Sequence, residues 1–440
     1  MRRIAQALLL LFAFSIPWEY SLDLGEPLGN VARVAGILVL LAAIPAVLAA
    51  GRLRRPDAFC WVTLALFLWF CCTCFWTIDA SVSLIRLRAC FQEFMIVWMV
   101  WEFADSPADL RNLLRATVAG CWVLAALTLA SFRSPQAIAD GQIRFAAYGQ
   151  DPNDVARFLV LGLPLAALLV NCEPRRLLRW IAFAFLPVAL VAVLLTASRS
   201  GFLAALLGLA GALFLLAAGR ARRVLAAFYA LPLFLAALWW LIPRATFDRL
   251  ATIPQQLQGG DWNQRTNIWS EGWIAFVHAP LFGAGVGAFV AAAHTAPIDT
   301  AHNTPLSILI GGGLCALFLV SVLVALAARA VLRCRGPLRL ALATCLIVLL
   351  VTAFVATVEE NRMTWLLFAL TIAAARLSAE DAPGAQACFR LTPPSLRTRQ
   401  ASACWAEIRR ALSGRGAKIN SSRLAADQPR ISGPRRSPAP

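Results

Sequence analysis

Long apolar blocks separated by short polar gaps fill most of this sequence. The blocks have lengths near the roughly 20 residues that an α-helix needs to cross a bilayer. The pattern predicts an all-α integral membrane protein with about twelve transmembrane helices. The predicted spans are residues 4–17, 30–50, 58–78, 84–104, 116–132, 155–171, 180–197, 201–218, 224–242, 304–332, 340–358 and 363–377.

Composition and the placement of charge favour the same class of protein. Hydrophobic residues make up 60% of the chain and the mean hydropathy is +0.71, which excludes a soluble globule and a disordered chain. A formal net charge of +17 suggests nucleic-acid binding, but the basic residues lie in short clusters at every second gap. That alternation is the positive-inside pattern of a membrane protein. We therefore expect membrane lipids as partners, no nucleic acid and a cytoplasmic N-terminus.

Both ends of the sequence bear on this topology. The first block follows Arg2 and Arg3 as in a signal peptide, but no small-residue cleavage site follows it, so we count it as a span. Residues 378–440 are rich in Pro, Ser and Arg and lack an apolar period. We expect residues 1–377 to form one polytopic domain and residues 378–440 to form a disordered, basic cytoplasmic tail.

Cysteines and glycines indicate neither a metal nor a cofactor. None of the twelve cysteines falls in a predicted outer loop, so no exposed disulfide framework is expected. Cys71-Cys72-Thr73-Cys74 lies inside an apolar block, where packing explains it better than metal binding. The Gly-x-Gly-x-Gly run at residues 283–287 lacks the preceding strand of a nucleotide site. Gly311-Gly312-Gly313 allows close helix approach or a local break in its span.

The longest polar interruption, residues 243–303, is the predicted periplasmic loop. It contains the isolated Arg265, and residues 265–277 have the period of an amphipathic helix at the membrane interface. The residues expected on one face of this helix are Arg265, Trp269, Trp273 and Phe276. The three histidines of the chain also lie in this loop, at His278, His294 and His302.

Three predicted outer helix starts share one pattern of capping residues. They are Asp151-Pro152-Asn153-Asp154, Ser198-Arg199-Ser200-Gly201 and His302-Asn303-Thr304-Pro305. Asn, Asp and Ser are good N-caps, so each start directs free backbone N–H groups and the positive end of a helix dipole toward one shared outer cavity. For any one start alone, ordinary helix capping is the better explanation. Together they form a candidate anion site, with Asn153, Asp154, Ser198 and Asn303 as secondary binding residues.

Arg199 departs from the positive-inside rule, because it lies on the outer side between two apolar helices. An unpaired charge near hydrocarbon costs on the order of 2.5–3.5 kcal/mol. Arg199 therefore pairs with a carboxylate such as Glu359 or Glu360, or it binds an anionic ligand. The residues alone leave both alternatives open.

His302 is the strongest candidate for a general base. An imidazole has an unperturbed pKa near 6.5 and accepts protons at neutral pH. A polar loop position explains the other two histidines, whereas His302 lies at a predicted helix start. Asp151, Asp154, Glu359 and Glu360 are rival bases.

At these residues the chain resembles the O-antigen ligase and polymerase superfamily of bacterial envelope enzymes, and within it most closely the O-antigen ligases. The resemblance covers roughly residues 140–330, and the motifs are individually short but specific in their order. The matching stretches are Tyr148-Gly149-Gln150-Asp151-Pro152-Asn153-Asp154, Leu195-Thr196-Ala197-Ser198-Arg199-Ser200-Gly201, Arg265-x-x-Ile268-Trp269, Pro280-Leu281-Phe282-Gly283-Ala284-Gly285 and Ala301-His302-Asn303.

The resemblance implies a multi-pass, metal-independent, inverting glycosyltransferase of the bacterial inner membrane, with its active site facing the periplasm. Its donor is a glycan on polyprenyl diphosphate such as undecaprenyl diphosphate, and in lipopolysaccharide biosynthesis a ligase has the lipid A core oligosaccharide as acceptor. By this resemblance Arg199 and Arg265 bind the diphosphate, and His302 deprotonates the acceptor hydroxyl. The forked, permanently charged guanidinium group suits such a phosphate site.

Other functions stay open at this point. A polymerase of O-antigen or exopolysaccharide transfers to another lipid-linked repeat, and a third member type transfers to a protein hydroxyl. The outer loop and span count favour a ligase. A polysaccharide transporter is an alternative of another class, although the chain lacks half-to-half symmetry. Arg86, Arg88 and Glu93 inside a predicted span support it best, unless they form a structural ion pair.

Overall fold

The structure, a computed structural model, describes residues 1–25, 28–134, 142–217, 236, 239–259, 265–295 and 300–379. The chain divides into two units, Met1–Leu391 and Thr392–Pro440, and every described residue belongs to the first. Most of the predicted span 224–242 and residues 380–440 of the predicted tail lie outside the described residues. The described part is helical and contains no β-strand, so the predicted all-α class is confirmed.

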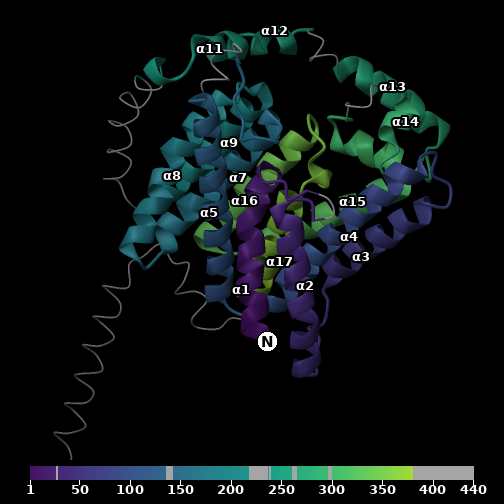
Figure 1. Cartoon of the computed structure of the whole chain (residues 1–440), viewed down its shortest axis with the longest axis horizontal. Helices are drawn as coiled ribbons and strands as arrows, with labels where there is room; N and C mark the ends of the chain where they lie inside the picture. Colours follow the sequence, from purple (N-terminus) through teal and green to yellow (C-terminus); the bar gives the residue numbers. More distant parts are fainter. Residues whose placement is uncertain are drawn as a thin grey trace, which may run out of the picture. The chain divides into compact units, whose positions relative to one another are not determined.

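The helices correspond closely to the apolar blocks of the sequence (Figure 1). Their bounds are α1 Arg2–Ser15, η1 Ile16–Ser21, α2 Val31–Ala50, α3 Ala58–Thr73, α4 Ala80–Phe103, α5 Pro107–Phe132, α7 Pro152–Cys172, α8 Arg176–Leu195, α9 Arg199–Ala217, α11 Arg244–Ala251, α12 Ile253–Leu257, α13 Arg265–His278, α14 Phe289–Ala293, α15 Thr304–Arg333, α16 Gly336–Ala353, η2 Val358–Glu360 and α17 Arg362–Ala379.

Within the described residues, eight segments are long and apolar enough to cross a membrane, and these give a multi-pass membrane protein. They are Arg2–Ser21, α2, α5, α7, α8, α9, α15 and α16. These residues do not confirm the predicted count of twelve. Helix α3 has only 16 residues, and α4 carries the charged residues Arg86 and Glu93 within its length.

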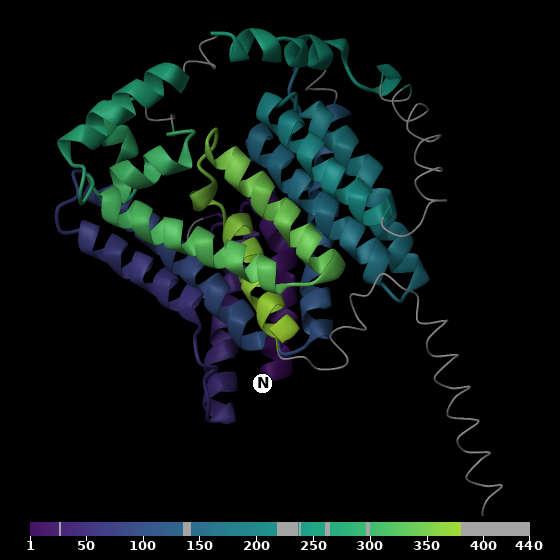
Figure 2. The ribbon, with the colours of Figure 1, turned by 180° about the vertical axis from the view of Figure 1, so that it is seen from behind.

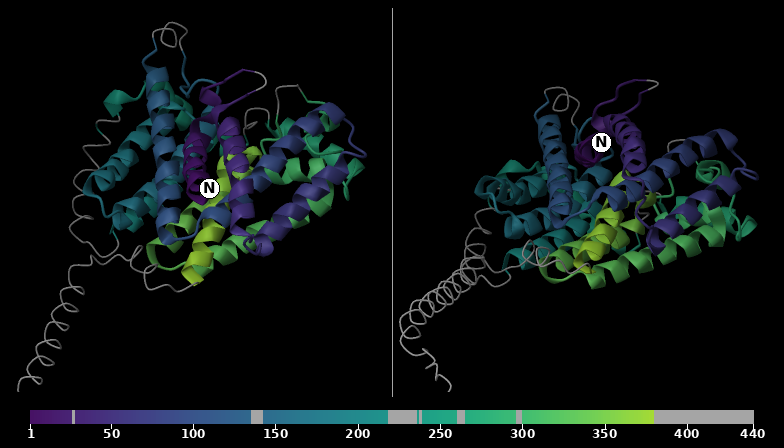
Figure 3. Two further views of the ribbon diagram at one scale, coloured as in Figure 1. Left: turned by 60° about the horizontal axis from the view of Figure 1, so that its bottom comes forward. Right: turned by 90° about the horizontal axis from the view of Figure 1, so that it is seen from below.

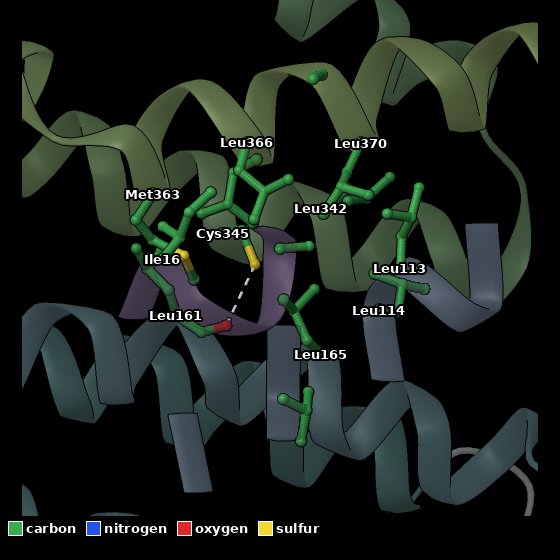
Figure 4. Close-up of a cluster of buried hydrophobic side chains, with 14 of the residues drawn as sticks. Ile16, Leu113, Leu114, Leu161, Leu165, Leu342, Cys345, Met363, Leu366 and Leu370 are labelled. Carbon is green, nitrogen blue, oxygen red and sulfur yellow. Dashed lines mark hydrogen bonds between the residues drawn. The ribbon is translucent and has the colours of Figure 1, made fainter. Parts of the chain in front are cut away.

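Helix α7 forms the centre of the core. Every residue from 155 to 170 is buried, because α5, α8, α9 and α16 all pack against this helix. Small residues permit the closest approach: a Cβ atom on Gly208 of α9 would lie 2.8 Å from Cγ1 of Val160. Figure 4 shows the Sγ of Cys345 donating to the carbonyl oxygen of Leu161 at 3.7 Å, among leucines of α5, α7, α16 and α17.

One end of the helices carries the functional residues considered below, and we call it the site end. Helices α7, α9 and α15 begin there, and α11 and α12 run across it between α9 and α13 (Figures 1 and 2). Helix α3 packs against both α4 and α15 (Figure 3). The site end is therefore built from helix termini and the short helices of the long polar loop.

Helix α13 lies where the amphipathic helix was predicted. Only some of the residues expected on one face of this helix pack against the protein. Trp269 and Phe276 pack against α14 and α15, and a Cβ on Gly272 would lie 2.8 Å from Cδ2 of Leu306. Trp273 is 57% exposed and lies outside this contact, and its ring centre is 5.1 Å from that of Phe276. The close approach at Gly272 centres the contact on that residue and leaves Trp273 beside it.

The glycine-rich segment at residues 280–285 packs against a break in α15. Gly313 has φ +67°, and a Cβ there would lie 2.2 Å from the carbonyl oxygen of Leu281. Ala284 N donates to the carbonyl of Ile310 at 2.7 Å across the same contact. Both alternatives for the three glycines, close approach and a local break, are present. The contact anchors the long loop to the helices.

Candidate functional site

Four arginines line one cavity of about 240 Å³ at the site end. Arg199 begins α9, Arg144 lies in the segment before α7, Arg249 lies in α11 and Arg265 begins α13. Each of these side chains is half-buried. The other lining residues are Asn153, Ser200, Leu203, Ala204, Ile253, Gln256, Val351, Thr352 and Val355. Among the described residues that line this cavity there is no Asp or Glu. We call it the arginine cavity.

Asn153 holds the starts of α7 and α9 together on one side of the arginine cavity. Its Oδ1 accepts from Nη2 of Arg144 at 3.0 Å and from Oγ of Ser198 at 2.7 Å. Ser198 in turn accepts from the backbone N of Gly201 at 3.1 Å, which caps the first turn of α9. Ser198 itself is buried behind the lining. Ser198 therefore orients Asn153. This role is less direct than the ligand contact that was predicted for Ser198.

The arginines hydrogen-bond mainly to neutral groups. Nε of Arg249 donates to the carbonyl of Ala197 at 3.1 Å, and Nε of Arg199 donates to the carbonyl of Arg249 at 3.4 Å. Nη1 of Arg265 donates to the carbonyl of Val355 at 2.9 Å. The ion pairs between described residues include none with Arg144, Arg249 or Arg265. These contacts fix the side chains without neutralising their charge.

Burial and mutual repulsion disfavour the charged form of the arginines in this cavity. Burial lowers the pKa of Arg144; Asp151 opposes this effect, and Arg199 adds to it. Burial, then Arg144 and Arg199, lower the pKa of Arg249. Burial also lowers the pKa of Arg265, and Arg144 contributes in the same direction while Asp151 opposes it. Because guanidinium groups stay protonated, the repulsion between them is relieved by a bound anion.

Two acidic residues at the predicted helix start, Asp151 and Asp154, have different roles. Asp151 caps α7, because its side chain accepts from the backbone N of Asn153 at 2.7 Å. Asp154 accepts from Nη2 of the buried Arg157 at 2.6 Å and is not among the residues that line the arginine cavity. A ligand contact for Asp154 stays a prediction, since its carboxylate already has a cationic partner.

The start of α15 lies close to the arginine cavity but does not line it. Asn303 caps this helix through its Oδ1, which accepts from the backbone N of Leu306 at 3.0 Å. His302 precedes it with φ +45° and its Nδ1 lies 3.3 Å from Oγ1 of Thr300. The expectation that all three helix starts share one cavity therefore stays a prediction for α15. Thr304 and Ser307 of α15 instead line a second cavity.

Residues 354–356 connect these two regions through three successive carbonyl groups. Nδ2 of Asn303 donates to Phe354 at 3.4 Å and Nη1 of Arg265 donates to Val355 at 2.9 Å. Oγ1 of Thr304 lies 2.8 Å from the carbonyl oxygen of Ala356. The segment thus fixes the start of α15, which carries His302, relative to Arg265.

The carboxylates proposed as partners of Arg199 have other contacts. Oε2 of Glu359 lies 2.6 Å from Oγ1 of Thr304, and Oε1 of Glu360 lies 3.8 Å from Nε of Arg86. Arg86 also pairs with Glu93 at 3.1 Å, which bears out the structural ion pair between these two residues. An anionic ligand for Arg199 stays a prediction.

Arg144 and Arg249 are site residues that the sequence did not single out. Each is an arginine in a predicted outer loop, which is the signal that marked Arg199. Arg133 and Arg244 carry the same signal, but they are exposed and line neither cavity. Only the folded loops distinguish the two pairs.

The described residues offer no group of three or more His, Cys, Asp or Glu side chains that could hold a metal ion. Their ten cysteines form no disulfide with one another. The polar groups that line the arginine cavity are guanidinium groups, amides and hydroxyls.

One known protein family matches a part of the chain that contributes to this site. The family described as O-antigen ligase matches residues 182–321. That segment runs from within α8 into α15 and contains Arg199, Arg249, Arg265 and His302. No curated protein matches the chain. Through residues 182–321, this multi-pass membrane protein is similar to the O-antigen ligase family, and that similarity implies lipid-linked glycans as substrates.

Proposed function

We propose that this protein is an O-antigen ligase of lipopolysaccharide biosynthesis. It transfers a glycan from polyprenyl diphosphate to the lipid A core oligosaccharide at the periplasmic face of the bacterial inner membrane. The observation that carries this proposal is the arginine cavity, where Arg144, Arg199, Arg249 and Arg265 come together from four segments.

A diphosphate suits this cavity in charge and in geometry. Each guanidinium group offers a planar fork of donors that matches phosphate oxygens, and four of them exceed the charge of one diphosphate. The first turns of α7 and α9 add the positive ends of two helix dipoles. Leu203, Ala204 and Val351 form an apolar part of the wall, against which a polyprenyl chain can pack.

In the proposed reaction, these groups act on the donor and the acceptor as follows. The acceptor hydroxyl oxygen attacks the anomeric carbon and forms the new glycosidic bond, while the bond from that carbon to the diphosphate oxygen breaks. The bonding electrons remain on the diphosphate, whose growing negative charge the arginines stabilise. The acceptor proton moves to the imidazole of His302, and a single displacement inverts the anomeric configuration. No metal or nucleotide sugar takes part.

Two contacts support the place of His302 in this scheme. It directly precedes Asn303, which donates to the carbonyl of Phe354, and Arg265 donates to the next carbonyl, that of Val355. The residue next to the proposed base and a proposed diphosphate ligand therefore donate to neighbouring peptide groups. Asn303 acts mainly as the N-cap that fixes this helix start.

Reconstitution tests the proposal. The purified protein in lipid nanodiscs is mixed with a glycan on undecaprenyl diphosphate and with lipid A core. We expect glycosylated lipid A core together with an equal amount of undecaprenyl diphosphate. Elongation of the lipid-linked glycan without modified core would indicate a polymerase instead. Movement of intact donor across sealed vesicles without any new glycosidic bond would indicate a transporter.

A further inference from the structure

The second cavity, of about 100 Å³, lies between α3, α4, α15, α16 and α17. Its polar lining includes Arg86, Glu93, Thr304, Ser307, Glu359, Glu360 and Thr364. The rest of its wall is apolar, with Phe70, Leu323 and Phe368 among the lining residues. We call it the glutamate cavity. We propose that it binds the acceptor as a neutral, hydroxyl-bearing sugar, with Glu359 accepting a hydrogen bond from the hydroxyl.

The charge of the glutamate cavity is opposite to that of the arginine cavity. Arg86 is its one cation among the described lining residues, and it lies 3.1 Å from Glu93 and 3.8 Å from Glu360. With Glu359 included, the lining has three carboxyl groups and one cation. Such a site repels a phosphate and suits a neutral donor of hydrogen bonds.

The carboxylate of Glu359 is fixed with one oxygen left over. Oε2 lies 2.6 Å from Oγ1 of Thr304. The carbonyl oxygen of Glu359 accepts from Nε1 of Trp365 at 2.9 Å, which holds the backbone in place. Oε1 is buried and makes no hydrogen bond of ordinary geometry within the described part of the chain. Because a buried acceptor without a partner is unfavourable, a ligand hydroxyl at this oxygen stabilises the site.

The protonation of Glu359 agrees with this geometry. Burial raises the pKa of its carboxyl to about 7, Glu360 adds to the increase, and Ser307 and Thr304 oppose it. The side chain is therefore close to the point where it gains or loses a proton at neutral pH, and a hydroxyl donor favours the ionised form.

The glutamate cavity lies close in the chain to His302, the proposed base of the transfer reaction. Thr304, which contacts Glu359, is two residues from His302, and residues 354–356 separate this region from Arg265. An anionic donor and a neutral acceptor then reach the start of α15 from cavities of opposite charge. This inference rests on the proposed function, because it takes the bound sugar to be the acceptor.

Kinetics with a small acceptor probe test the inference. Hexyl β-D-glucoside combines neutral hydroxyls with an apolar chain, as the lining of the glutamate cavity requires. In nanodiscs with saturating donor, Glu359→Gln should raise the KM for this probe by about tenfold, because a neutral amide replaces a charge-assisted acceptor. The KM for the donor and the kcat should change less than about threefold. The matched control is Glu271→Gln, an exposed glutamate of α13 outside both cavities, which should behave as the unmodified protein.

A second variant probes the cavity without altering the carboxylate. A Cβ on Gly311 would meet its nearest neighbour at 3.7 Å, an ordinary contact, so Gly311→Ala should fold normally and narrow the glutamate cavity. It should also raise the KM for the probe. If Glu359→Gln fails to accumulate, this variant decides the question alone.

Binding of radiolabelled hexyl β-D-glucoside without donor separates the two proposals. If the unmodified protein binds the probe, and both variants bind it more weakly, but no transfer occurs, the site stands and the ligase function fails. If transfer occurs with an unchanged KM in Gly311→Ala and in any Glu359→Gln protein obtained, the glutamate cavity is not the acceptor site. An equal effect of Glu271→Gln would also overturn it.

Discussion

Arg265 donates a hydrogen bond to the carbonyl oxygen of Val355 at 2.9 Å. Arg265 begins a short helix of the long polar loop, whereas Val355 follows α16 at the site end of the helices. The carbonyl groups on either side, of Phe354 and Ala356, lie within hydrogen-bond distance of Asn303 and Thr304. One arginine of the loop and the start of α15 are thus fixed to the same three peptide groups.

Loss of Arg199 or Arg265, the two arginines proposed from the sequence to bind the diphosphate, should abolish transfer. Arg199→Ala and Arg265→Ala should each lower kcat/KM for donor at least about 100-fold, because each removes a donor that stabilises the leaving diphosphate. Lys substitutions should restore little, since a point charge replaces a forked donor. Protein level and membrane insertion serve as controls. Normal transfer in either Ala variant would exclude that residue from the diphosphate site.

The additional arginines should contribute to donor binding. Arg144→Ala and Arg249→Ala should each raise the KM for the donor by about tenfold or more, the effect of losing one charged hydrogen bond. Suitable controls are Arg133→Ala in the same polar segment and Arg244→Ala in the same helix, both exposed. Equal effects in a variant and its control would mean that general charge, rather than the arginine cavity, attracts the donor.

Replacement of the proposed base should affect the rate and spare donor binding. His302→Ala should lose on the order of 10²–10⁴-fold in kcat, the usual range for a positioned base. His278→Ala and His294→Ala should lose little. The activity of the unmodified protein should fall on the acid side as imidazole becomes protonated. Normal transfer by His302→Ala, together with an essential Asp154 or Glu359, would transfer the role of base to that carboxylate.

The raised pKa of Glu359 predicts how stability depends on pH. An acid whose folded-state pKa is about 7, above its usual value, binds its proton more tightly when folded. Its contribution to stability is therefore present at low pH and lost as pH rises to about 7. Glu359→Gln, which stays neutral, should melt at a higher temperature than the unmodified protein at pH 8, with the difference shrinking toward pH 5. A difference that is constant over this range would contradict the raised pKa.

Two neighbouring glycines of α15 should respond differently to alanine. Gly313 has φ +67°, and its Cβ would lie 2.2 Å from the carbonyl of Leu281, so Gly313→Ala should destabilise the fold by about 1–3 kcal/mol or more. Gly311→Ala should not, because its Cβ meets only ordinary contacts. Melting temperatures in detergent compare the two. Equal melting temperatures would show that the contact between residues 280–285 and α15 is not needed for stability.

The sequence by itself determined the helical class, most helix positions and part of the site. Apolar blocks of membrane-spanning length specify helices because backbone groups in hydrocarbon must be paired within the segment. Asp151 and Asn303 cap their helices as their residue types predict, since capping is a local interaction. Arg199 was recognisable because a cation on the outer side breaks a rule that depends on sequence alone.

Only the tertiary structure decided which side chains share a cavity. Arg144 and Arg249 resemble other loop arginines until the segment before α7 and helix α11 place them beside Arg199. Thr304 lies at the third helix start, yet it faces Glu359 instead of the arginines. Such contacts join residues far apart in the chain and depend on how loops pack at the site end. Hydropathy and capping are set within a few residues, whereas the composition of a cavity is set by the packing of the whole fold.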